Sequence, residues 1–571
     1  MHCPPPEKPP FVAAEPIVDS TPISALTLMR LDQWRRRLSE GGPDSYGARF
    51  PEETAAILEG IEFGVPVDYE GDRSKDRFGR NPKVSPEHMP KVDAVIAADV
   101  AAGKKAGPFA RKPFPRMCIS PVGAVPKRNS EKVRVIHNLS YPFKGDSVNA
   151  GVVEKTFSLA GFGHAAQAVR RLGKGCLLIK LDVSAAYKQI PVKREDWPLL
   201  GFMWRGQYYY ERVLPFGLRS SCRLWDLYAS ALHFCFMHLL KTHAQRSVIH
   251  YVDDFLFVVE PGAEEAAHSM LAAAVALCEE LGLPLAPEKS EGPVTDLTFL
   301  GIKLDTVAMT ASLPADRLAE LKQLIVGWKM KETATVKELQ SLTGLLNFAC
   351  FVVRPGRFFL RRIIDHTSHI DKLGHGKHVR FAIPPAVFED IEWWHRFLPD
   401  WNGISLLYER EWEESTSIEL YTDACKAGYG GIFGKQWISG AWSPQELQAA
   451  QRTKCISMPF LELRALILAV ATWGHLWRGK KITFRCDCEP VVDAITKRTS
   501  KSPSSMHQLR LLSSYACSFG FDFKAVHVDG LANVLADPLS RLDLPKFRAA
   551  CPDADLHPQV VPRVALPSTM Q

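Results

Sequence analysis

The sequence lacks any apolar run long enough to cross a membrane, and its first ten residues, MHCPPPEKPP, lack the apolar core of a signal peptide. Its thirteen cysteines include no Cys-x-x-Cys pair, which argues against a disulfide framework or a zinc knuckle. A strong charge of one sign is also missing. The 70 basic and 63 acidic residues leave a net charge of +7, which is compatible with a polyanionic partner without establishing one. These absences predict an intracellular protein of the cytoplasm and/or nucleus, with no membrane contact.

What is present is an ordinary globular composition, with 46% hydrophobic and 23% charged residues. A chain of 571 residues is too long for one core, so several domains are expected. Runs of strand and helix pattern predict an α+β multidomain fold. Residues 1–90, which are rich in proline and turn residues near the start, are expected to form a largely disordered extension.

The most informative stretch is 247–260, SVIHYVDDFLFVVE, where Asp253 and Asp254 interrupt a β-rich apolar run. A second apolar strand, within 175–192, ends on Asp182. Buried carboxylates are costly unless they are paired or bind a cation. Three of them on neighbouring strands indicate a two-Mg²⁺ site for phosphoryl transfer. The alternative is a hairpin in which the two aspartates form only a turn.

Two segments supply candidate partners for such a site. The basic hairpin over 120–139 carries Lys127 and Arg134, which suit a triphosphate, although basic hairpins are usually only soluble turns. The Pro/Gly turn at 214–218 opens a predicted helix from about Ser220 to Leu240. Gly217 in this turn permits a close backbone approach, for example by a base pair, or it belongs to an ordinary strand-to-helix turn.

A second acidic set follows a helical region that begins near Pro314, after a predicted strand at 297–304. Its four acids fall in the order strand, helix, strand, helix, which favours metal ligands for hydrolysis, while each acid taken alone is compatible with a surface position. These acids are Asp423, Glu462, Asp487 and Asp537. His527 is a candidate proton shuttle or product-release group. The cysteines that flank Asp487 share one strand face and are interpreted as core residues.

Taken together, the motifs resemble the reverse transcriptase–ribonuclease H polyprotein of retrotransposons, from about Met117 to Arg541. Leu181-Asp182 with 186–190 (AYKQI) is similar to the first palm motif, 214–218 (LPFGL) to the template-grip motif, and 251–254 (YVDD) to the hallmark box. The sequence departs from the family at Ser220-Ser221-Cys222, where a small residue and proline are usual, and at Cys425, where serine is common.

The resemblance implies a right-hand polymerase with fingers, a palm built on an antiparallel sheet and a helical thumb, then a connection and a ribonuclease H-like α/β domain. The implied boundaries are 91–310 for fingers and palm, 311–370 for the thumb, 371–415 for the connection, 416–545 for the ribonuclease H-like domain and 546–571 for a tail.

The resemblance also implies roles for single residues. Asp182, Val183 and Asp253 would be metal ligands with Asp254 assisting, and Lys289 would protonate the leaving pyrophosphate. The implied substrate-binding residues are Lys127, Arg134, Tyr187, Phe216 and Gly217, with Tyr187 excluding a ribose 2′-hydroxyl. In the nuclease, Asp423, Glu462, Asp487 and Asp537 would bind metal beside His527. Each site would use two Mg²⁺ ions, with Mn²⁺ as a substitute.

The amino-acid sequence at 336–362, at Trp393-Trp394 and in the nuclease region is most similar to that of DIRS-type elements, in which a tyrosine recombinase inserts the DNA. The implied partners are an RNA template, a DNA primer, RNA–DNA hybrid and dNTPs, with an element-encoded recombinase and a Gag-like protein. The alternative is a catalytically decayed or domesticated copy that serves as a nucleic-acid-binding scaffold. Loss of a metal ligand would favour that alternative, and every expected ligand is present.

Overall fold

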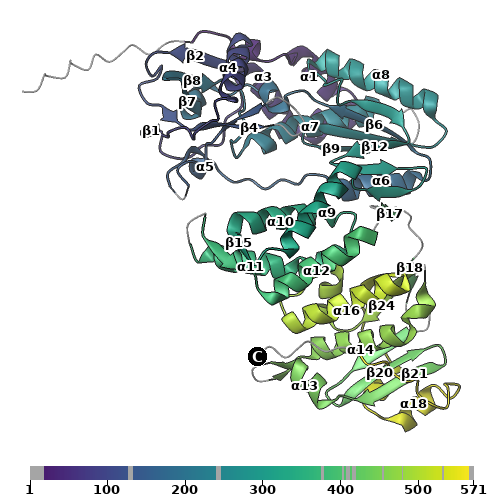
Figure 1. Cartoon of the computed structure of the whole chain (residues 1–571). Helices are drawn as coiled ribbons and strands as arrows, with labels where there is room; N and C mark the ends of the chain where they lie inside the picture. The colour runs from purple at the N-terminus through teal and green to yellow at the C-terminus, as the bar shows by residue number, and fades with distance from the viewer. Residues whose placement is uncertain are drawn as a thin grey trace, which may run out of the picture. The chain divides into compact units, whose positions relative to one another are not determined.

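The computed structural model describes residues 19–126, 133–143, 145–239, 246–374, 378–400, 404–406, 412–414, 420–452, 455–478, 480–529 and 533–564. The chain forms two compact units (Figure 1). The first comprises Met1–Leu300 with Leu304–Ala308, and the second comprises Gly301–Lys303 with Met309–Gln571.

A four-stranded antiparallel sheet lies at the centre of the first unit. Its strands, in spatial order, are β11 (Glu291–Val294), β6 (Leu177–Asp182), β10 (Asp254–Val259) and β9 (Arg246–Tyr251). Helices α6 (Phe162–Leu172), α7 (Ser221–Leu239) and α8 (Glu264–Leu281) pack against it. The apolar side chains from Phe255 to Val259 are almost fully buried, which is why this run forms a strand. Strands β9 and β10 form a hairpin within the apolar stretch 247–260, and the helix predicted from about Ser220 is confirmed as α7.

A second sheet of the first unit has the order β1 (Arg77–Phe78), β3 (Cys118–Ile119), β7 (Gly201–Trp204), β8 (Gln207–Glu211) and β2 (Lys105–Phe109). Helix α4 (Met89–Ala101) packs on β2 and on the hairpin of β4 (Val122–Pro126) and β5 (Val133–His137). The predicted basic hairpin is therefore present. Its tip, including Lys127, lies outside the described residues.

The prediction that residues 1–90 are largely disordered is wrong for residues 19–90. They include the 3₁₀ turn η1 (Ile23–Leu26) and helices α1 (Leu31–Ser39), α2 (Tyr46–Arg49) and α3 (Pro51–Phe63). Trp34 and Leu38 of α1 and Ile57 of α3 are fully buried, and α1 packs on α7 and α8. The proline-rich composition of this region predicts disorder. These apolar residues are nevertheless ordered because they dock on helices that lie some 200 positions later in the chain, the first of which, α7, begins at Ser221.

The single strand predicted at 297–304 is also wrong. The structure has two strands here, β12 (Asp296–Phe299) and β13 (Ile302–Asp305), separated by Leu300 and Gly301. Both separating residues have positive φ, of 49° and 77°, which ends one strand before the next begins.

The second unit begins with the helices that the sequence predicts after Pro314. These are α9 (Ala315–Lys329), α10 (Val336–Ala349), α11 (Arg361–Lys372) and α12 (Pro385–Asp400). Thr335 and Glu338 form the expected capping box at the start of α10. Two small antiparallel pairs accompany the helices, β15 (Thr333–Thr335) with β16 (Arg380–Ala382), and β14 (Thr310–Ser312) with β17 (Ile404–Leu406).

The rest of the second unit is an α/β structure. Strands β19 (Leu420–Ala424), β20 (Gly428–Phe433) and β21 (Gln436–Ala441) are antiparallel, and β18 (Trp412–Glu414), β24 (Lys481–Cys486) and β25 (Asp522–His527) are parallel. The short strands β22 (Gln451–Arg452) and β23 (Cys455–Ile456) pair with each other. The helices are α13 (Pro444–Ala450), α14 (Met458–Trp473), α15 (Glu489–Lys497), α16 (Pro503–Phe519), α17 (Ala536–Ser540) and α18 (Leu544–Ala550).

Helix α14 lies against β19 and β20 (Figure 1). Among the described residues, the stretch Met458–Trp477 is long and apolar enough to span a membrane, but 78% of its most apolar window is buried inside the protein. Such burial is typical of a core helix.

Candidate active sites

Three carboxylates meet at one end of the central sheet in the first unit. Asp182 is the last residue of β6 and lies directly opposite Asp254, the first residue of β10. Asp253 occupies the turn between β9 and β10, where its carbonyl accepts a hydrogen bond from Val183 N at 2.9 Å. The preceding Val252 has a positive φ of 54°, and Trp225 Nε1 donates to its carbonyl at 2.8 Å. A strained, anchored turn of this kind holds both adjacent acids at the sheet edge.

Burial makes this cluster costly in its charged state. It raises the pKa of Asp254 to about 6, with further contributions from the charges of Asp253 and Asp182. Burial also raises the pKa of Asp253, with Asp182 adding to the effect, while the positive charges of Lys289 and Arg134 oppose it. Carboxylates that repel one another in a partly buried site are suited to a divalent cation, which prefers oxygen ligands.

Lys289 neutralises part of this charge. Its ammonium donates to both oxygens of Asp182, at 2.8 and 2.9 Å. Burial lowers the pKa of Lys289, but the hydrogen bond and the charge of Asp182 outweigh it and raise the pKa above its ordinary value. The lysine is therefore a charged hydrogen-bond donor beside the first acid.

Two of the three carboxylates, Asp253 and Asp254, line a cavity of about 760 Å³. Its lining includes Arg134, Tyr187, Phe216 and Lys289 together with Asp253 and Asp254, so the structure gathers these predicted residues in one place. The rings of Tyr187 and Phe216 pack with centroids 5.2 Å apart. Their assigned roles stay predictions.

For two of the predicted site residues, Val183 and Gly217, the main chain and not a side chain is the relevant group. Val183 is buried, and only its main-chain carbonyl is a ligand group for a metal. Gly217 has a φ of 107°, and a methyl group there would collide with the carbonyl oxygen of His137. The glycine is thus required by the protein's own backbone. A base-pair contact at Gly217 stays a prediction.

The cavity also contains a charged network that sequence reasoning missed. Lys105 is buried between Glu211, at 2.7 Å, and Asp99, at 3.1 Å, and Lys188 donates to both oxygens of Asp99 at 2.6 Å. All four line the cavity. Lys188 stands beside Tyr187 in the quoted motif, but Lys105 and Glu211 are 106 positions apart, and no local spacing links them.

The second acidic set forms a tighter cluster in the second unit. Ligand oxygens of Asp423 on β19, Glu462 on α14 and Asp487 after β24 all lie within 4.8 Å of one another. Burial, followed by the charges of Asp423 and Asp487, raises the pKa of Glu462 to about 9. Burial likewise raises the pKa of Asp423 to about 6, against the hydrogen bond from Ser540. Three close acids, among them Asp423 and Glu462 with raised pKa values, are the donor set that a divalent cation needs.

Asp537, the fourth predicted ligand, lies at the edge of this cluster on α17. It accepts from Arg541 Nε at 2.7 Å, and its charge contributes to the raised pKa of Asp423. His527 is exposed, and its Nε2 lies 3.2 Å from the carbonyl of Asp487. The predicted residues are therefore neighbours, although their roles stay predictions.

Two further side chains, to which the sequence analysis assigns no role, hold the strand end that bears the first acid. Ser540 Oγ donates to Asp423 Oδ2 at 2.5 Å, and Asn533 Nδ2 donates to Thr422 O at 2.8 Å. Ser540 is fully buried. Both residues lie close in sequence to the predicted ligand Asp537, and this proximity was the available signal.

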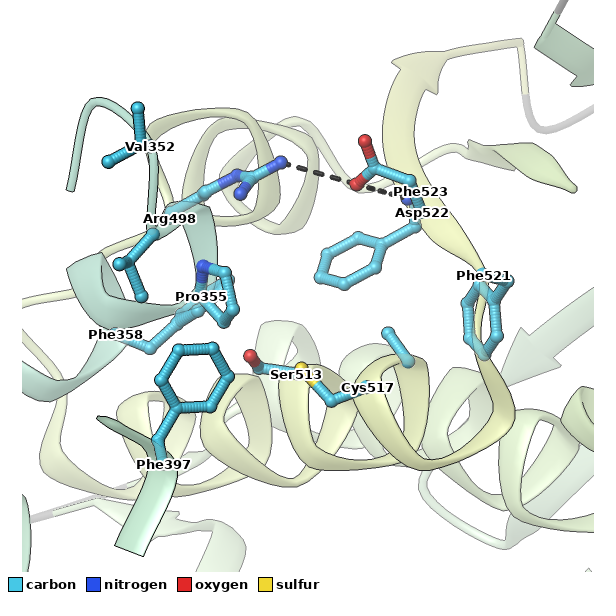
Figure 2. A pocket seen from close by; sticks show the side chains of 12 residues that line it. Val352, Pro355, Phe358, Phe397, Arg498, Ser513, Cys517, Phe521, Asp522 and Phe523 are labelled. Carbon is cyan, nitrogen blue, oxygen red and sulfur yellow. Dashed lines mark hydrogen bonds and ion pairs between the residues drawn. The ribbon is translucent and has the colours of Figure 1, made fainter. Parts of the chain in front are cut away.

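A smaller cavity, of about 220 Å³, lies elsewhere in the second unit (Figure 2). The rings of Phe358, Phe397 and Phe523 and an ion pair of 3.4 Å between Arg498 and Asp522 surround it. None of the described residues that line it belongs to either predicted site.

Residues 125–304 match the family described as reverse transcriptase (RNA-dependent DNA polymerase). The chain contains a reverse transcriptase domain. This domain includes Asp182, Asp253, Asp254 and Lys289, so the first carboxylate cluster lies within it. Relatives among retroelement and viral polyproteins agree with a retroelement reverse transcriptase.

The chain is similar to polyprotein P3 of Commelina yellow mottle virus, with 22% identity over 432 residues, covering 74% of this chain and 21% of the relative. It is also similar to the transposon Tf2-3 polyprotein of Schizosaccharomyces pombe, with 23% identity over 387 residues, covering 66% of this chain and 26% of the relative. The chain thus spans about a quarter or less of the length of these curated relatives. Both matches are longer than the reverse transcriptase domain.

Among solved structures, the chain is similar to a foamy viral protease-reverse transcriptase in complex with double-stranded DNA, with a TM-score of 0.46 and 18% identity. That similarity covers 87% of this chain and 81% of the other. A foamy viral protease-reverse transcriptase in complex with an RNA/DNA hybrid matches with a TM-score of 0.47 and 16% identity, covering 87% and 62%.

Proposed function

We propose that this chain is an RNA-directed DNA polymerase with a fused ribonuclease H, which copies retrotransposon RNA into DNA and degrades the RNA of the resulting hybrid. The observation that carries the proposal is the meeting of Asp182, Asp253 and Asp254 at the edge of a large cavity within the reverse transcriptase domain. This group of carboxylates, of which Asp253 and Asp254 line the cavity together with Arg134 and Lys289, suits a triphosphate and its cations.

The donor set fits two divalent cations, Mg²⁺ or Mn²⁺, held by Asp182, Asp253 and the carbonyl of Val183 with Asp254 nearby. When bound, such ions would lower the pKa of a primer 3′-hydroxyl and neutralise the charge of the triphosphate. Asp182 would hold such a cation, whose charge would take the place of the charge that Lys289 now supplies, and Lys289 would protonate the leaving diphosphate.

The other cavity residues bind and select the nucleotide. Arg134, which lines the cavity, would hold the triphosphate, and the resemblance implies the same role for Lys127, which lies outside the described residues. The ring of Tyr187, which packs on Phe216 and lines the cavity, would exclude a ribose 2′-hydroxyl. Bulk at that position favours dNTPs over rNTPs because the larger sugar loses room without gaining a partner.

For the second unit, Asp423, Glu462, Asp487 and Asp537 are the proposed metal ligands of a ribonuclease H-like site for hydrolysis of RNA in a hybrid. The 4.8 Å cluster supports this assignment. His527 would move a proton during the reaction or help product release. RNA in such a hybrid is distinguished by its 2′-hydroxyls and by the shape of the duplex.

The wider assignment follows the resemblance. We propose fingers and palm for 91–310, a thumb for 311–370, a connection for 371–415 and a ribonuclease H-like domain for 416–545. DIRS-type lineage, with an element-encoded tyrosine recombinase and a Gag-like protein as partners, is supported by the residues at 336–362 and 393–394. Intracellular action, in the cytoplasm and/or nucleus, follows from that life cycle.

The test is incorporation of dNTPs on an RNA template from a DNA primer, in Mg²⁺ and then Mn²⁺, beside Asp253→Asn. The account predicts incorporation that the substitution lowers to background, because an amide is a poor ligand and carries no charge. A folded protein that binds hybrid and incorporates nothing in either metal would contradict the proposal and favour the scaffold alternative.

A further inference from the structure

Tyr187 lies in a turn whose backbone needs support from its surroundings. The turn is the 3₁₀ turn η3 (Ala186–Gln189), and it follows Ala185, whose φ of 50° falls in the left-handed region. A non-glycine residue in this region costs free energy, and such a turn persists only when surrounding contacts stabilise it. The ring of Tyr187 packs on Phe216, and the residues beside it in the turn provide further contacts.

Lys188, the next residue of η3, anchors this turn to helix α4. Its ammonium donates to both oxygens of Asp99, each at 2.6 Å, and the side chains of Lys188 and Asp99 are 20% and 12% exposed. Burial raises the pKa of Asp99, but the positive charges of Lys105 and Lys188 outweigh it and lower the pKa below its ordinary value. Asp99 is therefore ionised at neutral pH, and a hydrogen bond between two charged groups is stronger than one between neutral groups.

Two neighbouring strands fix Asp99 in turn. Lys105 lies 3.1 Å from Asp99 and 2.7 Å from Glu211, and both Lys105 and Glu211 are buried. Lys105 on β2 and Glu211 on β8 are directly opposite each other in the sheet. Because this sheet holds Asp99 and Asp99 holds Lys188, the position of η3 depends on a regular element of the fold.

Other hydrogen bonds hold the end of the turn. Thr27 Oγ1 donates to Gln189 O at 2.6 Å, and Gln189 Nε2 donates to Ser184 O at 3.1 Å. These bonds do not depend on Lys188. Loss of the Lys188 ammonium should therefore loosen the turn beside Tyr187 without unfolding it.

We propose that Lys188 is a positioning residue for sugar selection, in which its ion pair with Asp99 keeps the Tyr187 ring where it would exclude a ribose 2′-hydroxyl. The inference rests on the proposed polymerase activity. Lys188, Asp99 and Tyr187 all line the same cavity. A selecting ring on an anchored backbone moves aside less readily than a ring that is held only by stacking on Phe216.

The competing role for Lys188 is direct contact with the triphosphate, because its side chain lines the cavity. The two roles differ in which nucleotides they affect. Phosphates are common to dNTPs and rNTPs, so loss of a phosphate contact would weaken both nucleotides equally. Loss of a positioning contact would change the ratio between them.

The test compares Lys188→Met and Lys188→Arg in the full chain, using kcat/KM for single additions of a dNTP and of the matching rNTP. Lys188→Met should lower the dNTP-to-rNTP preference about threefold to tenfold, a part of the effect that one charged hydrogen bond can have. This variant leaves Asp99 beside Lys105, so no buried charge loses its last partner. Lys188→Arg, which retains the charge, should preserve most of the preference. An equal fall for both nucleotides would overturn the inference.

A double-mutant cycle tests whether the ion pair is the cause. Asp99→Asn should also lower the preference, and adding it to Lys188→Met should lower the preference no further, since both substitutions remove the same contact. Additive losses would contradict the inference. Lys112→Met, which removes an ion pair of 2.7 Å with Asp76, is the matched control and should leave the preference unchanged.

A second measurement needs no catalysis. Ile190 N donates to Tyr187 O at 3.1 Å, so amide exchange in a peptide covering 184–190 reports opening of the turn. Hydrogen–deuterium exchange of this peptide should be faster in Lys188→Met than in the unmodified protein, while exchange in β10 should be unchanged. Equal exchange of the turn in both proteins would contradict the anchoring. An unmodified protein that fails to incorporate any nucleotide would overturn the proposed function while leaving this exchange result interpretable.

Discussion

At the scale of single residues, Ser540 orients the first acid of the second cluster. Its hydroxyl is buried and donates to Asp423 Oδ2 and lies 2.9 Å from Asp537 O. Groups that orient a ligand typically contribute 10- to 100-fold to metal affinity. Ser540→Ala should therefore raise the Mg²⁺ concentration needed for half-maximal hybrid cleavage about 10- to 100-fold.

The measurement is a Mg²⁺ titration of hybrid cleavage. Ser514→Ala, which removes an exposed hydroxyl on α16, is the matched control and should leave the titration unchanged. Cleavage by Ser540→Ala that responds to Mg²⁺ as the unmodified protein does would show that Asp423 needs no such support.

A second residue-scale prediction concerns acid stability. His137 is buried, its Nε2 lies 3.1 Å from Gly201 O, and its Nδ1 lies 3.9 Å from Glu211. Burial, and then the charge of Lys105, lower the pKa of His137 from 6.5 to about 3. Below pH 6.5 the unfolded chain binds a proton that the folded protein does not bind. The free energy of unfolding should therefore fall as the pH falls from 6.5 toward 3, by about 1.4 kcal/mol per pH unit for this group.

Urea unfolding of the full chain across this range tests the point, with His137→Gln as the comparison. The glutamine variant should show a weaker dependence on pH, by about one proton. Parallel pH profiles for the two proteins would indicate that His137 is not held neutral in the fold.

At the scale of elements, α1 is part of the core of the first unit. Trp34 is fully buried, its Nε1 donates to Leu281 O at 3.1 Å, and its ring packs edge-on against Tyr228. Trp34→Ala should lower the free energy of unfolding by about 3–5 kcal/mol, since the cavity left behind cannot close fully. Trp34→Phe, which keeps a ring, should cost less. If chemical unfolding of the full chain were unchanged in Trp34→Ala, the docking of α1 would be refuted.

Some features of these elements could be predicted from the sequence, and others could not. Asp182, Asp253 and Asp254 were predictable because acids inside apolar strand runs stand out locally, and the structure places Asp182 opposite Asp254. The docking of α1 was not predictable, because Trp34 finds its partner at Leu281. Glycine is required at position 217 because the carbonyl of His137 lies against it, and this too is a contact between distant segments of the chain. Long-range packing of this kind is not marked by any periodic pattern of residues in the sequence.

At the scale of the whole molecule, the two acidic clusters lie in different compact units. Asp182, Asp253 and Asp254 belong to the first unit, and Asp423, Glu462 and Asp487 belong to the second. Each unit has its own buried core, so a change at one cluster need not disturb the fold of the other. The account therefore holds that one chain carries two chemical sites that are separable by substitution.

The most direct test assays Asp253→Asn and Asp487→Asn for both activities on one RNA–DNA hybrid substrate. Asp253→Asn should lower dNTP incorporation by about a hundredfold to a thousandfold or more and leave RNA cleavage intact, and Asp487→Asn should do the reverse. Circular dichroism of each variant would establish that it is folded. If either substitution abolished both activities in a folded protein, the account of two independent active sites would be wrong.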